Sequence, residues 1–323
     1  MQVDPVAISI DGKLIPPFYA QISIINPSLH YAAGVVFEGM RCNHSADESK
    51  NFIFRLDDHI NRFFESLRIE KISVKFSKED IKNAIVEVCQ LSVAQKGHKD
   101  FYIRPHTYLE DKMMGLYQSK TPVHFAVESW AWDNYHGKSA LEVGARVWVS
   151  KYKKYANDPE LERWRAKSST NYGRYGVMEH NRAKDNGYDD ALFEDSNGNI
   201  AEAASSNIFF AKNGKVMTPS KETAILFGIT RRSVMELLSR EYCPVQEVEL
   251  PIEELFWMDE VFLTGTAARI VPVVSITDND GRDHHIGDGK PGPITKKAYD
   301  LYIKTVRGEL PEFNHWLTPV KEQ

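Results

Sequence analysis

One segment, residues 165–210, constrains what this chain can fold into more than any other. It reads RAKSSTNYGRYGVMEHNRAKDNGYDDALFEDSNGNIAEAASSNIFF, with Lys167 just ahead of three small hydroxylated residues. A helical pattern begins at Tyr175 and ends before Gly187, because glycine is the usual residue just past a helix C-terminus. The segment therefore predicts a lysine in an irregular stretch that leads directly into a helix.

A β-hairpin is predicted after this helix. A strand at 191–195, a turn of sequence SNGN and a second strand carrying Glu202 and Asn207 make up the hairpin. Taken singly, most lysines and glutamates are solvated surface groups. Together, a lysine with small neighbours and a carboxylate returned by a hairpin are what a pyridoxal phosphate site needs. The lysine forms a Schiff base and moves a proton, and the carboxylate keeps the pyridine nitrogen protonated.

The composition excludes several other classes of protein. A chain of 323 residues with 42% hydrophobic and 26% charged residues holds one large domain or two moderate ones. Its net charge of −5, with both signs interspersed, argues against a nucleic-acid-binding surface. No apolar run approaches the roughly 20 residues that span a bilayer, and the N-terminus does not read as a signal peptide. We therefore expect neither a nucleic acid nor a membrane as a partner.

The cysteines and the irregular segments bear on location and on domain organisation. Cys42, Cys89 and Cys243 are widely spaced and predict neither a disulfide framework nor a metal site, so the expected location is a reducing cytoplasm. Residues 130–137 are aromatic and polar and indicate the connection between two domains. Residues 151–165 form a charged loop, for which a lid and a merely solvated loop are equally open.

Periodicity and turn signals predict the remaining elements. Residues 6–26 indicate an opening hairpin, Asp57 an N-cap, and Ser77 the start of a helix that runs to Gly97. Pro105 favours an edge position or a bulge for the strand that contains it. The other predicted elements are strands at 52–54, 101–108, 123–128, 141–150 and 261–263, and a helix at 231–238 capped by Thr230.

Segments along nearly the whole chain carry a family resemblance. They are HYAAGVVFEGMR (30–41), RLDDHINRFFESL (55–67), FYIRP (101–105), KSSTNY (167–172), the 186–210 hairpin, FGITRRSVMELL (227–238), DEVFLTGTAARIVPV (259–273) and GPITKKAYDLY (292–302). On these segments the chain resembles the class IV (fold-type IV) pyridoxal phosphate-dependent aminotransferases, most closely the branched-chain amino acid aminotransferases. The resemblance implies a two-domain α+β fold, with a small α/β domain at 1–131, an interdomain loop at 132–137 and a large cofactor-binding domain at 138–323.

The resemblance also implies the cofactor, pyridoxal 5'-phosphate, and its ligands. Lys167 is the catalytic Schiff-base lysine, Tyr172 the partner of the phenolic oxygen and Glu202 the partner of the pyridinium nitrogen. Gly228 allows close approach to a helix start whose free N–H groups suit a phosphate. The cofactor-binding set is Arg62, Lys167, Tyr172, Glu202, Leu226, Gly228, Ile229, Thr230 and Thr266, with no metal. Asn207 is expected to support the turn.

The implied activity is transfer of an amino group between a branched-chain or other hydrophobic L-amino acid and 2-oxoglutarate. The residues expected to bind substrate are Phe37, Arg41, Tyr102, Arg104, Trp132, Thr266 and Ala267. Family members generally dimerise, with the pocket completed by a loop of the partner, so a homodimer is expected. Three alternatives remain: a transaminase for D-amino acids or (R)-amines, for which the 109–115 run leaves room; an aminodeoxychorismate-lyase-like enzyme; and a non-catalytic cofactor carrier.

Overall fold

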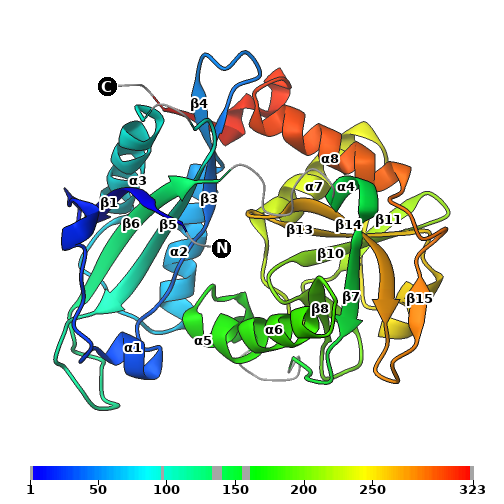
Figure 1. The fold of residues 1–323 in the computed structure, drawn as a ribbon, viewed down its shortest axis with the longest axis horizontal. Coiled ribbons are helices and arrows are strands. Elements are labelled where there is room, and N and C mark those ends of the chain that lie inside the picture. Colours follow the sequence, from blue (N-terminus) through cyan, green and yellow to red (C-terminus); the bar gives the residue numbers. More distant parts are fainter. Residues whose placement is uncertain (1–2, 96–97, 133–139, 155–160, 321–323) are drawn as a thin grey trace. The chain divides into compact units, whose positions relative to one another are not determined.

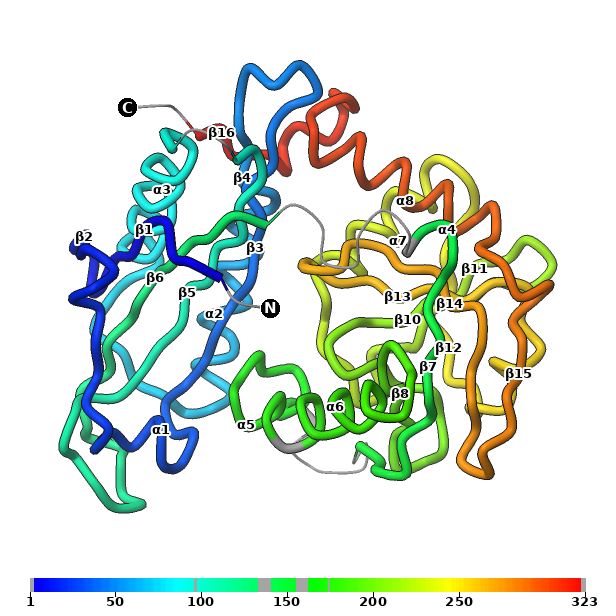
Figure 2. The backbone as a smooth tube through the Cα atoms, in the orientation of Figure 1, coloured from blue at the N-terminus to red at the C-terminus, as the bar shows by residue number. Residues whose placement is uncertain are grey.

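The computed structural model describes residues 3–95, 98–132, 140–154 and 161–320, and the chain forms two compact units. Unit 1 comprises Met1–Asp133, Ala166–Thr170 and Lys304–Gln323, and unit 2 comprises Asn134–Arg165 and Asn171–Ile303. Each unit contains a β-sheet with helices packed on it (Figure 1), and Figure 2 traces the path of the chain through both. The predicted α+β class is confirmed.

The sheet of unit 1 has the strand order β16-β4-β3-β5-β6-β1-β2, and these neighbours are antiparallel in the described residues. Its strands are β1 (Pro5–Ile10), β2 (Lys13–Leu14), β3 (Met40–His44), β4 (Asn51–Phe54), β5 (Phe101–Leu109), β6 (Val123–Ala131) and β16 (Leu317–Val320). The predicted strands at 52–54, 101–108 and 123–128 are confirmed. The opening hairpin is shorter than predicted, since its second strand has only two residues.

Two helices, α2 (Leu56–Ile69) and α3 (Lys78–Val93), pack on this sheet (Figure 1). Apolar residues recur every three or four positions along both helices and form one stripe on each, which the sheet covers. The shared core contains Leu56, Ile60, Phe63, Leu67, Ile81, Ile85, Val88, Ile103 and Val127. The other helical segments assigned to this unit are η1 (Pro17–Tyr19), α1 (Pro27–Tyr31) and η5 (Pro311–Trp316).

The starts of these two helices differ in how well the sequence predicted them. Ser77 caps α3 as predicted, since its hydroxyl accepts from the Asp80 N–H and the Asp80 carboxylate accepts from the Ser77 N–H. The helix ends at Val93, whereas the predicted end, Gly97, lies outside the described residues. The prediction of Asp57 as a cap is wrong. Helix α2 begins at Leu56, and its N-cap position is a left-handed Arg55 (φ 51°). Asp57 therefore lies in the first turn.

The interpretation of Pro105 as an edge or bulge residue is also wrong. Strand β5 lies between β3 and β6 in the interior of the sheet. The β3–β5 pairing covers only Phe101 to Ile103, so the missing N–H of Pro105 falls where the β3 ladder has ended. Its carbonyl still accepts a hydrogen bond from the Glu38 N–H (2.8 Å).

The sheet of unit 2 has the order β12-β11-β10-β13-β14-β7-β8-β9, and β15 also pairs with β14. The pairs β11–β12, β14–β7 and β7–β8 are parallel. The strands are β7 (Ala145–Val149), β8 (Asp190–Glu194), β9 (Ile200–Ala203), β10 (Asn207–Lys212), β11 (Lys215–Pro219), β12 (Val245–Val248), β13 (Glu260–Gly265), β14 (Arg269–Thr277) and β15 (Asp283–His285). The predicted strand at 261–263 is confirmed as part of β13.

The helical segments that lie wholly within unit 2 are shorter than α2 and α3 of unit 1. They are α4 (Ala140–Val143), η2 (Leu161–Arg165), η3 (Tyr172–Val177), α6 (Met178–Asp185), α7 (Ile229–Glu241) and η4 (Ile252–Trp257); α5 (Ser169–Asn171) and α8 (Pro293–Val306) contain residues of both units. The predicted strand 141–150 is partly wrong, because Gly144 (φ 78°) separates α4 from β7. A side chain at Gly144 would also lie 2.3 Å from Val274.

Two predictions within residues 165–210 are wrong in their element boundaries. Helical structure begins at Ser169, two residues after Lys167, rather than at Tyr175. The predicted second strand of the hairpin is two strands, because a turn closed by the Ala203 N–H and the Ser206 carbonyl (2.8 Å) ends β9 before β10 begins. The helix end is confirmed, since Gly187 has φ 83° just past α6.

Segments far along the chain belong to unit 1, whereas the sequence assigned everything after residue 138 to the second domain. Strand β16 pairs with β4, and residues 166–168 lie beside residues 35–37. Residues 133–139, which contain most of the predicted interdomain loop, are outside the described residues. Among the described helices, none combines the length and the apolar character that crossing a membrane requires.

Candidate active site

Lys167 is held in unit 1 by its backbone. Its carbonyl accepts from the Phe37 N–H (3.0 Å), and its N–H donates to the Ser66 hydroxyl on α2 (2.9 Å). Two residues later, the Ser169 N–H donates to the Val35 carbonyl (3.0 Å). The Lys167 amine, Nζ, lies 4.9 Å from the centroid of the Phe37 ring. These backbone contacts on two sides fix the direction in which the lysine side chain leaves the chain.

Arg62 on α2 is held by a fully buried carboxylate. Its Nε donates to Glu38 Oε1 (2.6 Å) and its Nη2 to Glu38 Oε2 (2.9 Å), the paired geometry that a guanidinium forms with a carboxylate. His59 lies on the same helix, and its Nδ1 is 2.7 Å from Glu38 Oε2. The Glu38 side chain is 0% exposed and that of Arg62 12%. Glu38 therefore sets the orientation of Arg62.

The protonation states in this cluster follow from burial and charge. Burial would raise the pKa of Glu38, but the Arg62 guanidinium and the hydrogen bond with His59 outweigh it and hold the pKa well below its ordinary value. Burial lowers the pKa of His59 and outweighs the effect of Glu38. At neutral pH the carboxyl is therefore ionised and the imidazole neutral, so Nδ1 carries the proton that Glu38 accepts.

Aromatic side chains gather around Arg104 in unit 1. Its Cζ lies 4.9 Å from the ring centroid of Phe37 and 5.4 Å from that of Tyr102, and Nη2 is 3.5 Å from the Tyr102 hydroxyl. The Tyr102 ring lies 5.1 Å from Trp130 and 5.3 Å from Trp132, centroid to centroid. Four predicted substrate residues are thus brought together, with Trp130 as an addition that the sequence prediction left out.

Arg41, a fifth predicted substrate residue, contacts the backbone of this cluster. It is 3% exposed, its Nη2 donates to the Trp132 carbonyl (2.6 Å) and it lies 3.8 Å from the Asp100 carboxylate. Two residues before it, Gly39 leaves room for Tyr102, whose hydroxyl would be 1.8 Å from an added Cβ. Arg41 therefore supports the position of Trp132.

Glu202 is the central acidic residue of unit 2. It lies on β9 and is 7% exposed. Oε1 accepts from Lys154 Nζ (2.5 Å), and Oε2 accepts from Asn207 Nδ2 (2.9 Å) and from the Leu226 N–H (3.1 Å). Asn207 also donates to the Leu226 carbonyl (2.9 Å), so it links the carboxylate to the loop before α7 rather than only supporting a turn.

The predicted phosphate-binding turn is the start of α7. The helix begins at Ile229 with Gly228 as its N-cap, so the prediction of Thr230 as the cap is wrong. A Cβ at Gly228 would lie 1.9 Å from Asn207 Oδ1, so this position has room only for a residue without a side chain. The first N–H groups of a helix of this length have no partner within the helix and favour an anion. Gly228, Ile229 and Thr230 stand at that end.

The remaining predicted residues lie in turns of unit 2. Tyr172 is half-buried and opens the π-helical segment η3, a distortion that often occurs at functional sites. Thr266 and Ala267 are half-buried in the turn between β13 and β14, which a left-handed Arg269 (φ 62°) completes.

Sequence reasoning missed several residues of these surroundings. Glu38 had a signal, since it is a single charge within the apolar run VVFEGM. His59 had none beyond its position in a matched segment, and Trp130 had none beyond its place in the aromatic segment 130–137. Lys154 belongs to the run KYKKY, which is typical of a solvated loop, yet it is 7% exposed. The lid and solvated-loop interpretations of 151–165 remain open for residues 155–160, which lie outside the described part of the chain.

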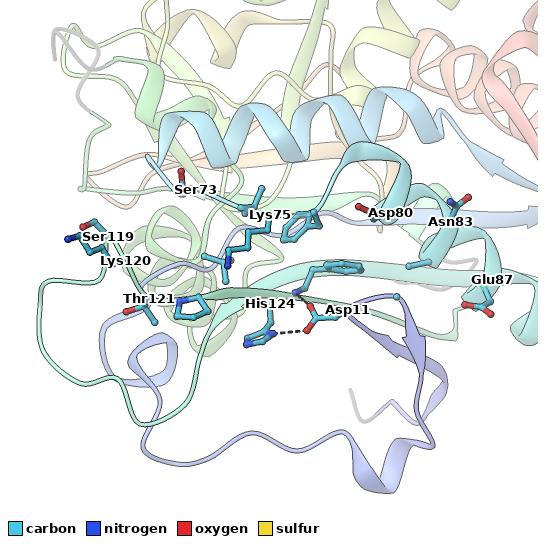
Figure 3. Close-up of a pocket in the computed structure, with 17 residues that line it drawn as sticks. Asp11, Ser73, Lys75, Asp80, Asn83, Glu87, Ser119, Lys120, Thr121 and His124 are labelled. Carbon is cyan, nitrogen blue, oxygen red and sulfur yellow. Dashed lines mark hydrogen bonds and ion pairs between the residues drawn. The ribbon is translucent and has the colours of Figure 1, made fainter.

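Unit 1 also has two hollows. One of about 940 Å³ contains Lys75, Asp80 and His124 (Figure 3) and includes none of the predicted site residues. Burial would lower the pKa of His124, but hydrogen bonds with Asp11 and Glu110 raise it above its ordinary value. The other, of about 330 Å³, borders Ser168 and Thr170, just after Lys167. Within the described residues, no group of three or more acidic, His or Cys side chains is placed to hold a metal.

We expect Glu38→Gln to lower the free energy of unfolding by about 3 kcal/mol at pH 7, because it removes the buried carboxylate that binds both Arg62 and His59. The depressed pKa of Glu38 means that its stabilisation is present above the unfolded pKa of about 4.3 and is lost as the pH falls toward the folded pKa. Urea unfolding should therefore show the gap between wild type and variant narrowing below about pH 4.3.

Asp57→Asn on the same helix is the matched control. Asp57 is 73% exposed and pairs only at the surface with Lys82, so the change should cost less than about 1 kcal/mol. A wild-type-to-E38Q gap that stays constant down to about pH 3 would contradict the assignment of an ionised, stabilising Glu38.

Comparison with known proteins places the chain in a family. The family model for amino-transferase class IV matches residues 35–276. A probable branched-chain-amino-acid aminotransferase of Aquifex aeolicus (strain VF5) is 35% identical, with 97% of this chain and 96% of the relative covered. The branched-chain-amino-acid aminotransferase of Escherichia coli (strain K12) is 30% identical, with 98% and 97% covered.

Solved structures agree with the sequence matches. The branched-chain aminotransferase of the archaeon Thermoproteus uzoniensis, solved with norvaline, has a TM-score of 0.85 at 31% identity, covering 98% of this chain and 100% of that one. The holo, PLP-form enzyme of Thermobaculum terrenum has a TM-score of 0.86 at 29% identity, with 99% and 100% covered. With a family model that matches most of its length and relatives that match nearly all of it, this chain belongs to the class IV aminotransferases.

Proposed function

We propose that the chain is a pyridoxal phosphate-dependent transaminase that moves an amino group between a branched-chain or other hydrophobic L-amino acid and 2-oxoglutarate. The observation that carries the proposal is the near-full-length likeness to enzymes named branched-chain-amino-acid aminotransferases. The same likeness does not favour the D-amino acid, (R)-amine or lyase alternatives. A reducing cytoplasm is the proposed location, supported by three free cysteines.

The residues present fit the cofactor of this family, pyridoxal 5'-phosphate. A carboxylate has about four acceptor positions, and the described donors to Glu202 use three, which leaves one for a pyridinium N–H. The start of α7 suits a phosphate, as does a guanidinium held as rigidly as that of Arg62. When bound, the cofactor supplies an electron sink for the charge left as the substrate Cα–H bond breaks.

The chain's own residues then have distinct tasks. Lys167 would be the point of covalent attachment and, once released, the base that takes the proton from the substrate Cα and delivers it to C4′ of the cofactor. Glu202 keeps the pyridine nitrogen protonated, and Tyr172 donates to the phenolic oxygen. Arg62, the turn at 228–230 and Thr266 bind the phosphate, while Leu226 packs on the ring.

Substrate recognition falls to the cluster around Arg104 and to a turn. Phe37, Tyr102 and Trp132 supply apolar surface for a hydrophobic side chain, with Arg104 among them as the group that suits a carboxylate. We propose that Arg41 supports the position of Trp132. The backbone of Thr266 and Ala267 binds the substrate carboxylate.

We further propose a homodimer formed through unit 1. Large apolar side chains are exposed in segment 18–31, among them Ile24 (83%), and in segment 113–117, among them Leu116 (88%). The two segments adjoin, since the Lys112 N–H donates to the Ile25 carbonyl (2.8 Å). An exposed apolar patch of this kind marks an interface. Leu116 also borders the smaller hollow that contains Ser168, so a covering copy would lie beside the Lys167 stretch.

Lys167→Ala should abolish transamination while the fold is kept, because no other residue takes over both attachment and proton transfer. Activity assays and circular dichroism measure the two effects. Lys151→Ala, a change to an exposed lysine, is the control and should leave activity unaltered. Retained turnover in the K167A variant would refute the assignment.

The absorption band of the cofactor-loaded protein should change on addition of L-leucine but not of D-alanine or (R)-1-phenylethylamine, because Tyr102 and Arg104 are retained. A response to D-alanine or the (R)-amine alone would move the substrate proposal to the first alternative. No response to any amine would favour the carrier, and no cofactor band after added pyridoxal 5'-phosphate would contradict the transaminase in every form.

Light scattering should give a mass of twice 36.9 kDa for the wild type. Leu116→Glu should shift the mass to that of one chain, because it places a charge in an apolar interface. Val143→Glu alters an equally apolar but separate residue of unit 2, 68% exposed, and should leave the mass unchanged. A monomeric wild type would count against the dimer.

A further inference from the structure

Unit 2 contains a buried lysine–glutamate pair, and the lysine of this pair has no role assigned so far. Lys154 and Glu202 are each 7% exposed, and Nζ lies 2.5 Å from Oε1. Nζ also lies 5.3 Å from the centroid of the Trp164 ring and 5.5 Å from that of Phe193. The Lys154 N–H donates to the Glu194 carbonyl (2.9 Å), so the backbone of the lysine is fixed as well.

A surface pair of the same unit shows how unusual this burial is. Lys184 also pairs with a carboxylate, Asp189, at 3.2 Å, but the two side chains are 44% and 42% exposed. Such a pair contributes little to stability, because water competes for both charges. Removing one partner of a pair as buried as Lys154–Glu202 instead leaves the other charge without compensation, which is strongly destabilising.

The arrangement around Glu202 is asymmetric in a way that suits a further ligand. Both neutral donors, Asn207 and the Leu226 N–H, bind Oε2, whereas Lys154 is the donor on Oε1. The acceptor position that remains on the carboxylate is therefore on Oε1, the oxygen that the cation holds. The three donors fix the carboxylate in orientation without using its full capacity.

We propose that Lys154 is a positioning residue that prepares the cofactor site: its cation holds the Glu202 carboxylate in a fixed orientation before pyridoxal 5'-phosphate arrives. The role of Glu202 toward the pyridine nitrogen rests on the proposed function. Without the Lys154 cation, a buried carboxylate either takes up a proton or turns toward water. In either case a protonated pyridine nitrogen loses its anionic partner, and the cofactor binds more weakly.

A double-mutant cycle on the apo-protein tests the pair without any cofactor. Lys154→Met and Glu202→Gln should each lower the melting temperature by about 6–15 °C, because each leaves one buried charge alone. The double variant, which removes both charges, should lose clearly less than the sum of the two. Lys184→Met is the control and should stay within about 2 °C of the wild type, as expected for a pair in which both side chains are exposed.

Two further measurements separate positioning from general support of the fold. Infrared spectra of apo K154M at neutral pH should contain a protonated carboxyl band that is absent from the wild type and from K154M/E202Q. Titration with pyridoxal 5'-phosphate should give a dissociation constant raised about tenfold or more in K154M but within about threefold of the wild type in Lys154→Arg, which keeps the cation.

The inference would be overturned if the decreases in melting temperature of the two single variants add up in the double variant. It would also be overturned if K154M bound the cofactor as tightly as the wild type. If K154M does not fold while K154M/E202Q does, the coupling is demonstrated all the same. The proposed function is tested separately by the wild type: a wild-type protein that binds no pyridoxal 5'-phosphate would overturn that proposal, whatever the apo cycle shows.

Discussion

Each of the two units buries carboxylates, and around two of them, Glu38 and Glu202, the neighbouring groups are arranged so that the charge is not left alone. Glu38 is matched by Arg62 and by a neutral His59, and Glu202 by Lys154, Asn207 and a backbone N–H. Burying an ion is costly unless nearly every acceptor position is used. This requirement explains why polar side chains lie at positions that face protein rather than water, on helix α2 for Glu38, and at Asn207 and Lys154 for Glu202.

Backbone geometry positions the lysine to which we assign cofactor attachment. Lys167 lies two residues before a helical segment and is bonded through its backbone to residues 35–37 and to α2. These main-chain contacts set the point from which its side chain leaves the chain. The same logic applies at Gly228, where the absence of a side chain lets Asn207 reach across to the loop.

The sequence predicted those parts of the fold and site that depend on local patterns. Periodicity indicated α2 and α3, and Ser77 and Gly187 marked a helix start and a helix end correctly, because caps are short-range chemistry. The prediction from sequence failed where a residue distant in the chain determines the local structure. Asn207 leaves no room for a side chain at Gly228, the residue that caps α7, and Pro105 is tolerated inside the sheet because β3 ends beside it. Lys154 looked solvated, since nothing in KYKKY tells which lysine faces Glu202.

An apolar pair would fill the Lys154–Glu202 position at least as stably, since buried ion pairs seldom exceed well-packed hydrophobic residues in stability. An apolar pair could not, however, hold an anion at one fixed place. Burying the Lys154 cation costs free energy. Holding the Glu202 carboxylate in this way serves a purpose only if the carboxylate binds a second partner. The other residues of β9 are buried and apolar. The charged pair at this strand therefore indicates function more than stability.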